Sequence, residues 1–147
     1  MKRSFLLGLG LFSAAVVTIP GTVLAQDFPP PPPATYYGSI SGSGVAAGQG
    51  VVAIVVSGNT STICGTGSVV DASGLHYVVD VVTNDQTAGC GQAGRTVRFY
   101  VTPPNANTGG SLAVESPSWA GAGPHLQNLT TGSPLTKRAV APTAAKD

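Results

Sequence analysis

The chemistry of the two cysteines is the feature of this chain that the sequence predicts most directly. Cys64 and Cys90 are the only cysteines among 147 residues. They could form a disulfide, act as a reactive thiol pair or supply half of a metal site. There is no C-x-x-C spacing, and the two histidines, His76 and His125, are far apart in the sequence. We therefore predict a Cys64–Cys90 disulfide that closes a loop of about 26 residues.

His76 and Asp80 come closest to the pattern of a hydrolase. On one face of a strand they would lie about 13 Å apart, because a strand rises about 3.3 Å per residue. That distance is too long for a hydrogen bond, and no G-x-S-x-G nucleophile motif is present. The six acidic residues are scattered, which gives no glycosidase pair. We expect a protein that is not an enzyme and that has no cofactor.

Three aspartates, Asp71, Asp80 and Asp85, could bind Ca²⁺ at the ends of strands. No dense Asp/Asn ligand repeat surrounds them, so solvated carboxylates in turns are the favoured interpretation and no metal site is predicted. The sequons Asn59-Thr60-Ser61 and Asn128-Leu129-Thr130 match the N-glycosylation pattern. We interpret them as ordinary residues of Thr-rich strands.

Aromatic side chains are the candidates for ligand binding. Tyr37, Tyr100 and Trp119, together with Tyr36, could form a platform on which a sugar stacks. Alternatively, the same rings close the ends of a core made mostly of valine. The first alternative predicts a carbohydrate-binding module, and the second predicts a purely structural role.

The N-terminal residues have the pattern of a secretory signal peptide. Lys2 and Arg3 precede an apolar run from Phe5 to Ile19, and Val23-Leu24-Ala25 offers a cleavage site. The run is shorter than the roughly 20 residues that span a bilayer. We predict a signal peptide over 1–25, a secreted protein at or near the cell surface, and no membrane span after cleavage.

Charge argues against two classes of partner. After removal of Lys2 and Arg3, five basic and six acidic residues leave a net charge of −1. Nucleic-acid binding requires a clustered positive surface, and so does attraction to an anionic membrane. We predict neither partner, and an oxidising compartment that favours the disulfide.

Composition and turn residues predict an all-β domain. The chain contains 20 Gly and 12 Pro, yet 42% of its residues are apolar. We divide it into a proline-rich linker (26–35, with a polyproline II run at 29–33), a β-domain (36–131) and a disordered tail (132–147). About seven short strands separated by turns predict a β-sandwich. The expected strands are 36–40, 51–56, 60–64 with 65–70 as its continuation or a separate strand, 75–82, 95–101, 111–115 and 125–131.

Alternation assigns the two faces of the central strands. The side chains expected in the core are Val51, Ala53, Val55, Leu75, Tyr77, Val79, Val81, Val97, Phe99 and Val101. The opposite face is also apolar, with Val52, Ile54, Val56, Val78 and Val82. An exposed patch of this kind usually marks an interaction surface. We expect either self-association through it, or burial of both faces of 51–56 beneath the 41–50 loop.

The order of these features resembles a known group of modules. It consists of Tyr37-Gly38, Val51 with Ala53, Cys64-Gly65-Thr66, Tyr77, Gly89-Cys90, Val97-x-Phe99-x-Val101 and Trp119-x-Gly121. This pattern is similar to small immunoglobulin-like or transthyretin-like modules of microbial extracellular proteins, and most of all to the carboxypeptidase regulatory-like group.

The resemblance covers about residues 36–130 and implies a non-catalytic extracellular role. One departure is the spacing of Leu126 and Leu129, which are three residues apart where the closing strand of such modules tends to alternate leucines at spacing two. This spacing predicts a bulge or a frayed end in the last strand. The resulting expectation is a structural or adhesive module at the cell surface, whose partner is a polysaccharide or a surface protein.

Overall fold

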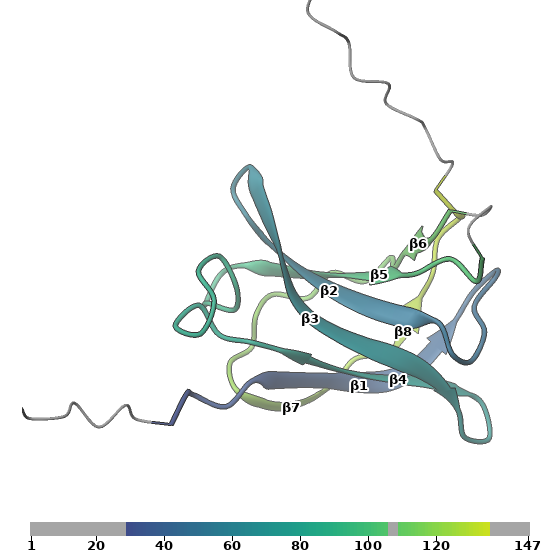
Figure 1. Cartoon of the computed structure of the whole chain (residues 1–147), viewed down its shortest axis with the longest axis horizontal. Coiled ribbons are helices and arrows are strands. Elements are labelled where there is room, and N and C mark those ends of the chain that lie inside the picture. The colour runs from purple at the N-terminus through teal and green to yellow at the C-terminus, as the bar shows by residue number, and fades with distance from the viewer. Residues whose placement is uncertain (1–28, 106–108, 136–147) are drawn as a thin grey trace, which may run out of the picture.

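The computed structural model describes residues 29–105 and 109–135 (Figure 1). These residues contain eight strands, joined by turns and loops, and no helix. The predicted signal peptide and residues 136–147 of the predicted tail lie outside these ranges. The all-β prediction is confirmed. The strands are β1 (Ala34–Ser41), β2 (Gly50–Ser57), β3 (Thr60–Asp71), β4 (Leu75–Val81), β5 (Thr96–Val101), β6 (Ser111–Leu112), β7 (Gly123–Leu126) and β8 (Leu129–Thr130).

Most strand boundaries differ from the prediction by one residue or two, and β6 is three residues shorter than the expected strand 111–115. Three further differences change an assignment. β1 begins at Ala34, so two residues assigned to the linker belong to the first strand. β3 is one strand of 12 residues, which settles the open alternative for 60–70. The expected last strand, 125–131, is present as β7 and β8, interrupted at Gln127 and Asn128.

The strands join into one mixed sheet in the order β6-β5-β2-β3-β4-β1-β7, and β8 also pairs with β1. β7 and β8 run parallel to β1, whereas the other strand pairs are antiparallel. A bridge between Ala113 and Thr131 brings the β6 side of the sheet against the β8 side. Two backbone hydrogen bonds flank this bridge, Val114 N to Thr130 O (2.8 Å) and Gly132 N to Leu112 O (2.9 Å). The sheet therefore curls until its two ends touch.

The bend of the sheet lies in β3. Its first part pairs with β2 and its last part pairs with β4. β3 therefore connects two facing halves of the sheet, one formed by β2, β5 and β6 and the other by β4, β1 and β7 (Figure 1). The register against β2 shifts at Cys64, which has no partner and forms a β-bulge. Gly65 and Gly67 follow, and a Cβ at either position would collide with a carbonyl oxygen of β4. The absence of these side chains lets β4 approach β3 closely at the bend.

The core lies between the two halves. All the side chains predicted to point inward are buried except Leu75, which packs against the core from a partly buried position. The ring of Phe99 on β5 meets Tyr36 and Tyr77 edge-on, at centroid distances of 5.4 and 5.8 Å. These aromatic contacts join β5 to β1 and β4 across the core. The finer prediction, a two-sheet sandwich of immunoglobulin or transthyretin type, stays a prediction.

Candidate interaction surface

The predicted disulfide is present and is part of a well-packed end of the molecule. Cys64 and Cys90 are joined with a Cα–Cα distance of 5.4 Å, and both are almost completely buried. The Arg95 guanidinium donates to Asn84 Oδ1 (2.7 Å) and to the carbonyl of Cys90 (2.5 Å). The loop that carries Cys90 is therefore held by one covalent bond and by one cationic side chain. This geometry supports a structural role for the cysteines.

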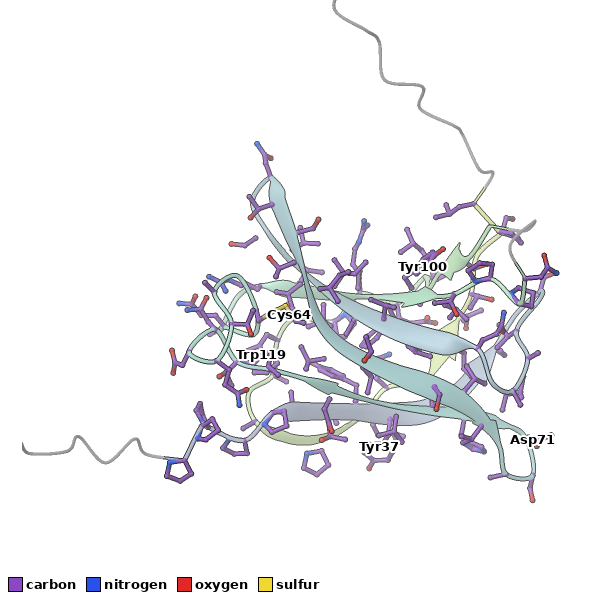
Figure 2. The ribbon with its side chains drawn as sticks, viewed as in Figure 1. Tyr37, Cys64, Asp71, Tyr100 and Trp119 are labelled. Atoms are coloured by element: carbon purple, nitrogen blue, oxygen red, sulfur yellow. A yellow bond between two sulfur atoms is a disulfide. The ribbon has the colours of Figure 1, made fainter. Side chains whose placement is uncertain are left out.

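Trp119, the first of the three predicted ligand residues, lies at this disulfide end (Figure 2). Its amide donates to the carbonyl of Arg95 (2.7 Å), and its side chain packs against the core. Gly91 lies beneath the indole, where a Cβ would collide with the six-membered ring. The indole ring therefore packs over the disulfide loop.

Tyr100 lies elsewhere, on the outer face of β5 near β6 (Figure 2). Its neighbours across the sheet are Val52 on β2 and Leu112 on β6. The side chain is half-buried, and its phenol lies against Gly110, which has no room for a Cβ. Tyr100 therefore covers the end of the β5–β6 pair.

Tyr37 is the most accessible of the three. Its side chain is 40% exposed on the outer face of β1, in the lower half of the molecule. Figure 2 shows Tyr37, Tyr100 and Trp119 well apart from one another. The structure does not bring the three predicted ligand residues together into one aromatic platform.

A different group of side chains surrounds Tyr37. Val78 on β4 and Leu126 on β7 are its direct neighbours on either side, and they are 52% and 69% exposed. These three form an apolar row across β4, β1 and β7. Beside the row is a shallow hollow of about 370 Å³, which is also lined by the side chains of Ser39, His76 and Asn128. We refer to the row and the hollow as the Tyr37 surface.

Sequence reasoning found part of the Tyr37 surface. Tyr37 was a ligand candidate, and Val78 was expected on the outer face. Leu126 was missed, because its position beside Tyr37 depends on the parallel pairing of β7 with β1, which joins residues 89 positions apart. The three-residue spacing of Leu126 and Leu129 was the available signal, since it places them on opposite faces, one exposed and one buried.

The face predicted for self-association is divided in the structure. Val52, Ile54 and Val56 lie on the outer side of β2 but are half-buried, whereas Val78 is exposed two strands away. The assignment of Val82 to this face is wrong, because its side chain packs against the core. β4 ends at Val81, so the alternation of side chains along the strand does not extend to Val82.

The described acidic residues that the sequence singled out, Asp71 and Asp80, have local hydrogen-bond partners. The Thr35 hydroxyl donates to Asp80 Oδ1 (2.5 Å), and Asp71 Oδ1 accepts from Gly74 N (3.3 Å) in the β3–β4 turn. Within residues 29–105 and 109–135, no three His, Cys, Asp or Glu side chains are grouped as metal ligands would be. In the same part of the chain, no helix has the length and hydropathy to cross a membrane.

Two buried tyrosines are perturbed electrostatically. Burial raises the pKa of Tyr77 well above its usual value, and the nearby Glu115 carboxylate raises this pKa further. The Tyr77 hydroxyl donates to the carbonyl of Gln127 (2.6 Å). Burial also raises the pKa of Tyr36, and the nearby backbone of Ala120 acts in the opposite direction to a smaller extent. The Tyr36 hydroxyl makes no hydrogen bond of good geometry. Both groups belong to the core rather than to the surface.

Comparison of the chain with protein-family models, with curated proteins and with solved structures finds no match.

Proposed function

We propose that the protein is a secreted, non-catalytic β-module with a structural or adhesive role at the cell surface, and that it contacts its partner through the Tyr37 surface. One observation carries this proposal. Tyr37, Val78 and Leu126 form a contiguous apolar row on three neighbouring strands, and every member is at least 40% exposed. Apolar groups gathered in this way commonly mark an interaction site.

The composition of the Tyr37 surface favours a surface protein as the partner. The lining of the hollow is mostly apolar, and it contains no Asp, Glu, Lys or Arg. The polar side chains at its border are partly engaged already, since Asn128 Oδ1 accepts a hydrogen bond from Ser39 N (3.1 Å). Such a surface gains free energy mainly by removing apolar area from water.

Retention on cell envelopes tests the proposal. Purified mature protein is mixed with envelopes of the producing organism, and the bound fraction is measured after sedimentation. Val78→Lys places a charge in the row and is expected to abolish retention. Ile63→Lys is the matched control, because Ile63 is 65% exposed on β3 and lies outside the Tyr37 surface. The proposal would be contradicted if the bound fraction fell equally in both variants, or if it stayed at the wild-type level in both.

Carbohydrate binding is the second candidate, and the exposed ring of Tyr37 beside His76 and Ser39 is the observation that favours it. Treatment of the envelopes with protease separates the two candidates. Retention that survives protease and that is lost in Tyr37→Ala but kept in Tyr37→Phe would identify a stacked sugar. Retention that disappears with protease would identify a surface protein.

A further inference from the structure

The first strand and the last strands of the described chain lie side by side and point the same way. β1 pairs in parallel with β7 over Ala34–Tyr37 and with β8 over Ile40–Ser41. We refer to β1 together with β7 and β8 as the terminal-strand pair. The offset between partners is the same in both segments, so the pair continues in one register along the whole of β1.

Hydrogen bonds join the terminal-strand pair from one end to the other. The backbone bonds outside the regular ladders include Gly123 N to Pro33 O (3.1 Å), Gln127 N to Tyr37 O (2.8 Å) and Thr131 N to Ser41 O (2.8 Å). The ladder is interrupted between β7 and β8, where Asn128 Oδ1 accepts from Ser39 N (3.1 Å). The side chain of Asn128 thus takes the place of a backbone acceptor at the interruption.

Parallel pairing fixes how a pull on the chain acts on these bonds. The chain enters β1 at Ala34 and leaves β8 at Thr130, and these positions are at opposite ends of the pair (Figure 1). Tension between the two sides of the module therefore draws β1 and β8 past each other along the strand axis. All the hydrogen bonds between them are loaded together, whereas a pull applied at one end of both strands would open them one after another.

We propose that the terminal-strand pair lets this module bear tension along the chain. The proposal rests on the structural role at the cell surface proposed above and adds a mechanical function to it. Forced unfolding is governed by the unfolding rate. A transition state that requires several inter-strand bonds to break at once is reached slowly, and this makes the module resistant to stretching along this axis.

The disulfide adds a second mechanical feature. The 26-residue separation between Cys64 and Cys90 remains closed when the rest of the domain unfolds. An extended chain spans at most about 3.3–3.6 Å per residue. Unfolding of the oxidised protein is therefore expected to release about 85 Å less chain than unfolding of the reduced protein, after subtraction of the 5.4 Å between the two Cα atoms.

Single-molecule stretching of the mature chain tests the proposal by comparing two directions of pull. In the first direction, handles are attached at the two termini. In the second, one handle remains at the N-terminus and the other is attached to Ala122→Cys, an exposed position directly before β7 and at the same end as Ala34. The expected unfolding force is about twofold higher or more in the first direction, because many bonds rather than one bear the load there. Equal forces in the two directions would overturn the proposal.

A matched pair of substitutions tests whether Asn128 contributes. Asn128→Ala removes the acceptor for Ser39 N and is expected to lower the end-to-end unfolding force, whereas Asn128→Asp keeps an acceptor oxygen and is expected to preserve most of it. Asn59→Ala is the control, because Asn59 is exposed in the β2–β3 turn outside the pair. A force unchanged by Asn128→Ala, or lowered equally by Asn59→Ala, would exclude this contribution. No partner is needed for these measurements, so they can fail while envelope retention succeeds, and the reverse also holds.

Discussion

At one end of the molecule the Cys64–Cys90 disulfide joins β3 to the loop before β5, whereas at the other end the side chain of Gln49 joins two loops by hydrogen bonds alone. Gln49 is 7% exposed, and its Nε2 donates to the carbonyls of Gly44 (3.1 Å) and Thr102 (3.0 Å). Its Oε1 accepts from Ala46 N (2.6 Å). One neutral side chain thus satisfies three backbone groups.

The two ends also differ in how completely their polar atoms are paired. Among the described residues, the buried side-chain oxygens without a hydrogen bond are Tyr36 Oη and Thr83 Oγ1. Tyr36 Oη lies near the backbone of Ala120, next to Trp119, and Thr83 is bridged to Gly91 in the disulfide loop. Both therefore lie at the disulfide end. The comparison suggests that an end closed by a covalent bond tolerates unpaired hydroxyls, whereas an end closed by hydrogen bonds must pair its groups.

Removal of the disulfide is expected to have the largest effect. The double substitution Cys64→Ala, Cys90→Ala should lower the free energy of unfolding by about 3.5 kcal/mol, because the chain-entropy model gives this value for a loop of about 26 residues. Domains of this kind are stable by only about 5–15 kcal/mol, so the variant should be marginal. Denaturant titration measures the change. An unchanged midpoint would show that packing alone closes this end.

Gln49→Leu should have the second-largest effect, at the opposite end. Leucine has a similar volume but leaves the carbonyls of Gly44 and Thr102 and the amide of Ala46 without their partner. We expect the free energy of unfolding to fall by about 2 kcal/mol. Gln92→Leu is the control, because Gln92 is exposed in the disulfide loop and should change stability by less than about 0.5 kcal/mol. Similar losses in both variants would remove the contrast between the ends.

The buried strand faces and the disulfide could be predicted from the sequence, because they follow from local alternation and from the cysteine count. Alternation along 51–55, 75–81 and 97–101 identified the buried faces, because side chains in a strand point alternately to opposite sides. The presence of only two cysteines, together with the predicted signal peptide, predicted the disulfide that the structure contains. The role of Gln49 could not be predicted, since it depends on Thr102, 53 residues further along the chain.

Pairings between distant segments explain the other differences. β6 and β8 contain two residues each, too few for a periodic signal, yet their flanking residues bring the ends of the sheet together. The Tyr37 surface was only partly predicted for the same reason, because Leu126 reaches Tyr37 through a parallel pairing. Tyr100 and Trp119 were chosen by residue type, and residue type does not specify the glycines against which these rings pack.

Arg95→Ala tests whether the disulfide end also depends on hydrogen bonds. The substitution removes the donor to Asn84 Oδ1 and to the Cys90 carbonyl, and we expect a loss of about 1.5 kcal/mol in the free energy of unfolding. Arg98→Ala is the matched control on the exposed face of β5, with an expected change below about 0.5 kcal/mol. A loss for Arg95→Ala larger than that for removal of the disulfide would mean that the covalent bond is not the main closure of this end.

Tyr77→Phe is expected to cost about 1 kcal/mol, because it leaves the Gln127 carbonyl without its hydroxyl donor. The same substitution should change the alkaline behaviour. Since the pKa of Tyr77 is raised in the folded protein, its contribution is fully present below the ordinary tyrosine pKa of about 10 and is lost as the pH rises further. The wild-type protein should therefore lose stability above about pH 10, and Tyr77→Phe should lose it less steeply. Thermal unfolding at several pH values measures both slopes, and identical slopes would contradict the assignment.

The smallest effect is expected for Tyr36→Phe, and it tests the idea that the disulfide end tolerates an unpaired hydroxyl. The side chain of Tyr36 is 1% exposed, its ring contacts Phe99 and His125, and its hydroxyl makes no hydrogen bond of good geometry, although the backbone of Ala120 is near. Phenylalanine keeps the ring contacts and removes only the unpaired group, whose burial is unfavourable. The free energy of unfolding should stay the same or rise by up to about 1 kcal/mol, in contrast to the loss expected for Tyr77→Phe. A loss of more than about 1 kcal/mol would mean that the Tyr36 hydroxyl has a bound partner, such as a buried water. Both ends of the molecule would then pair their polar groups fully, and the disulfide would be an addition to that pairing rather than a substitute for it.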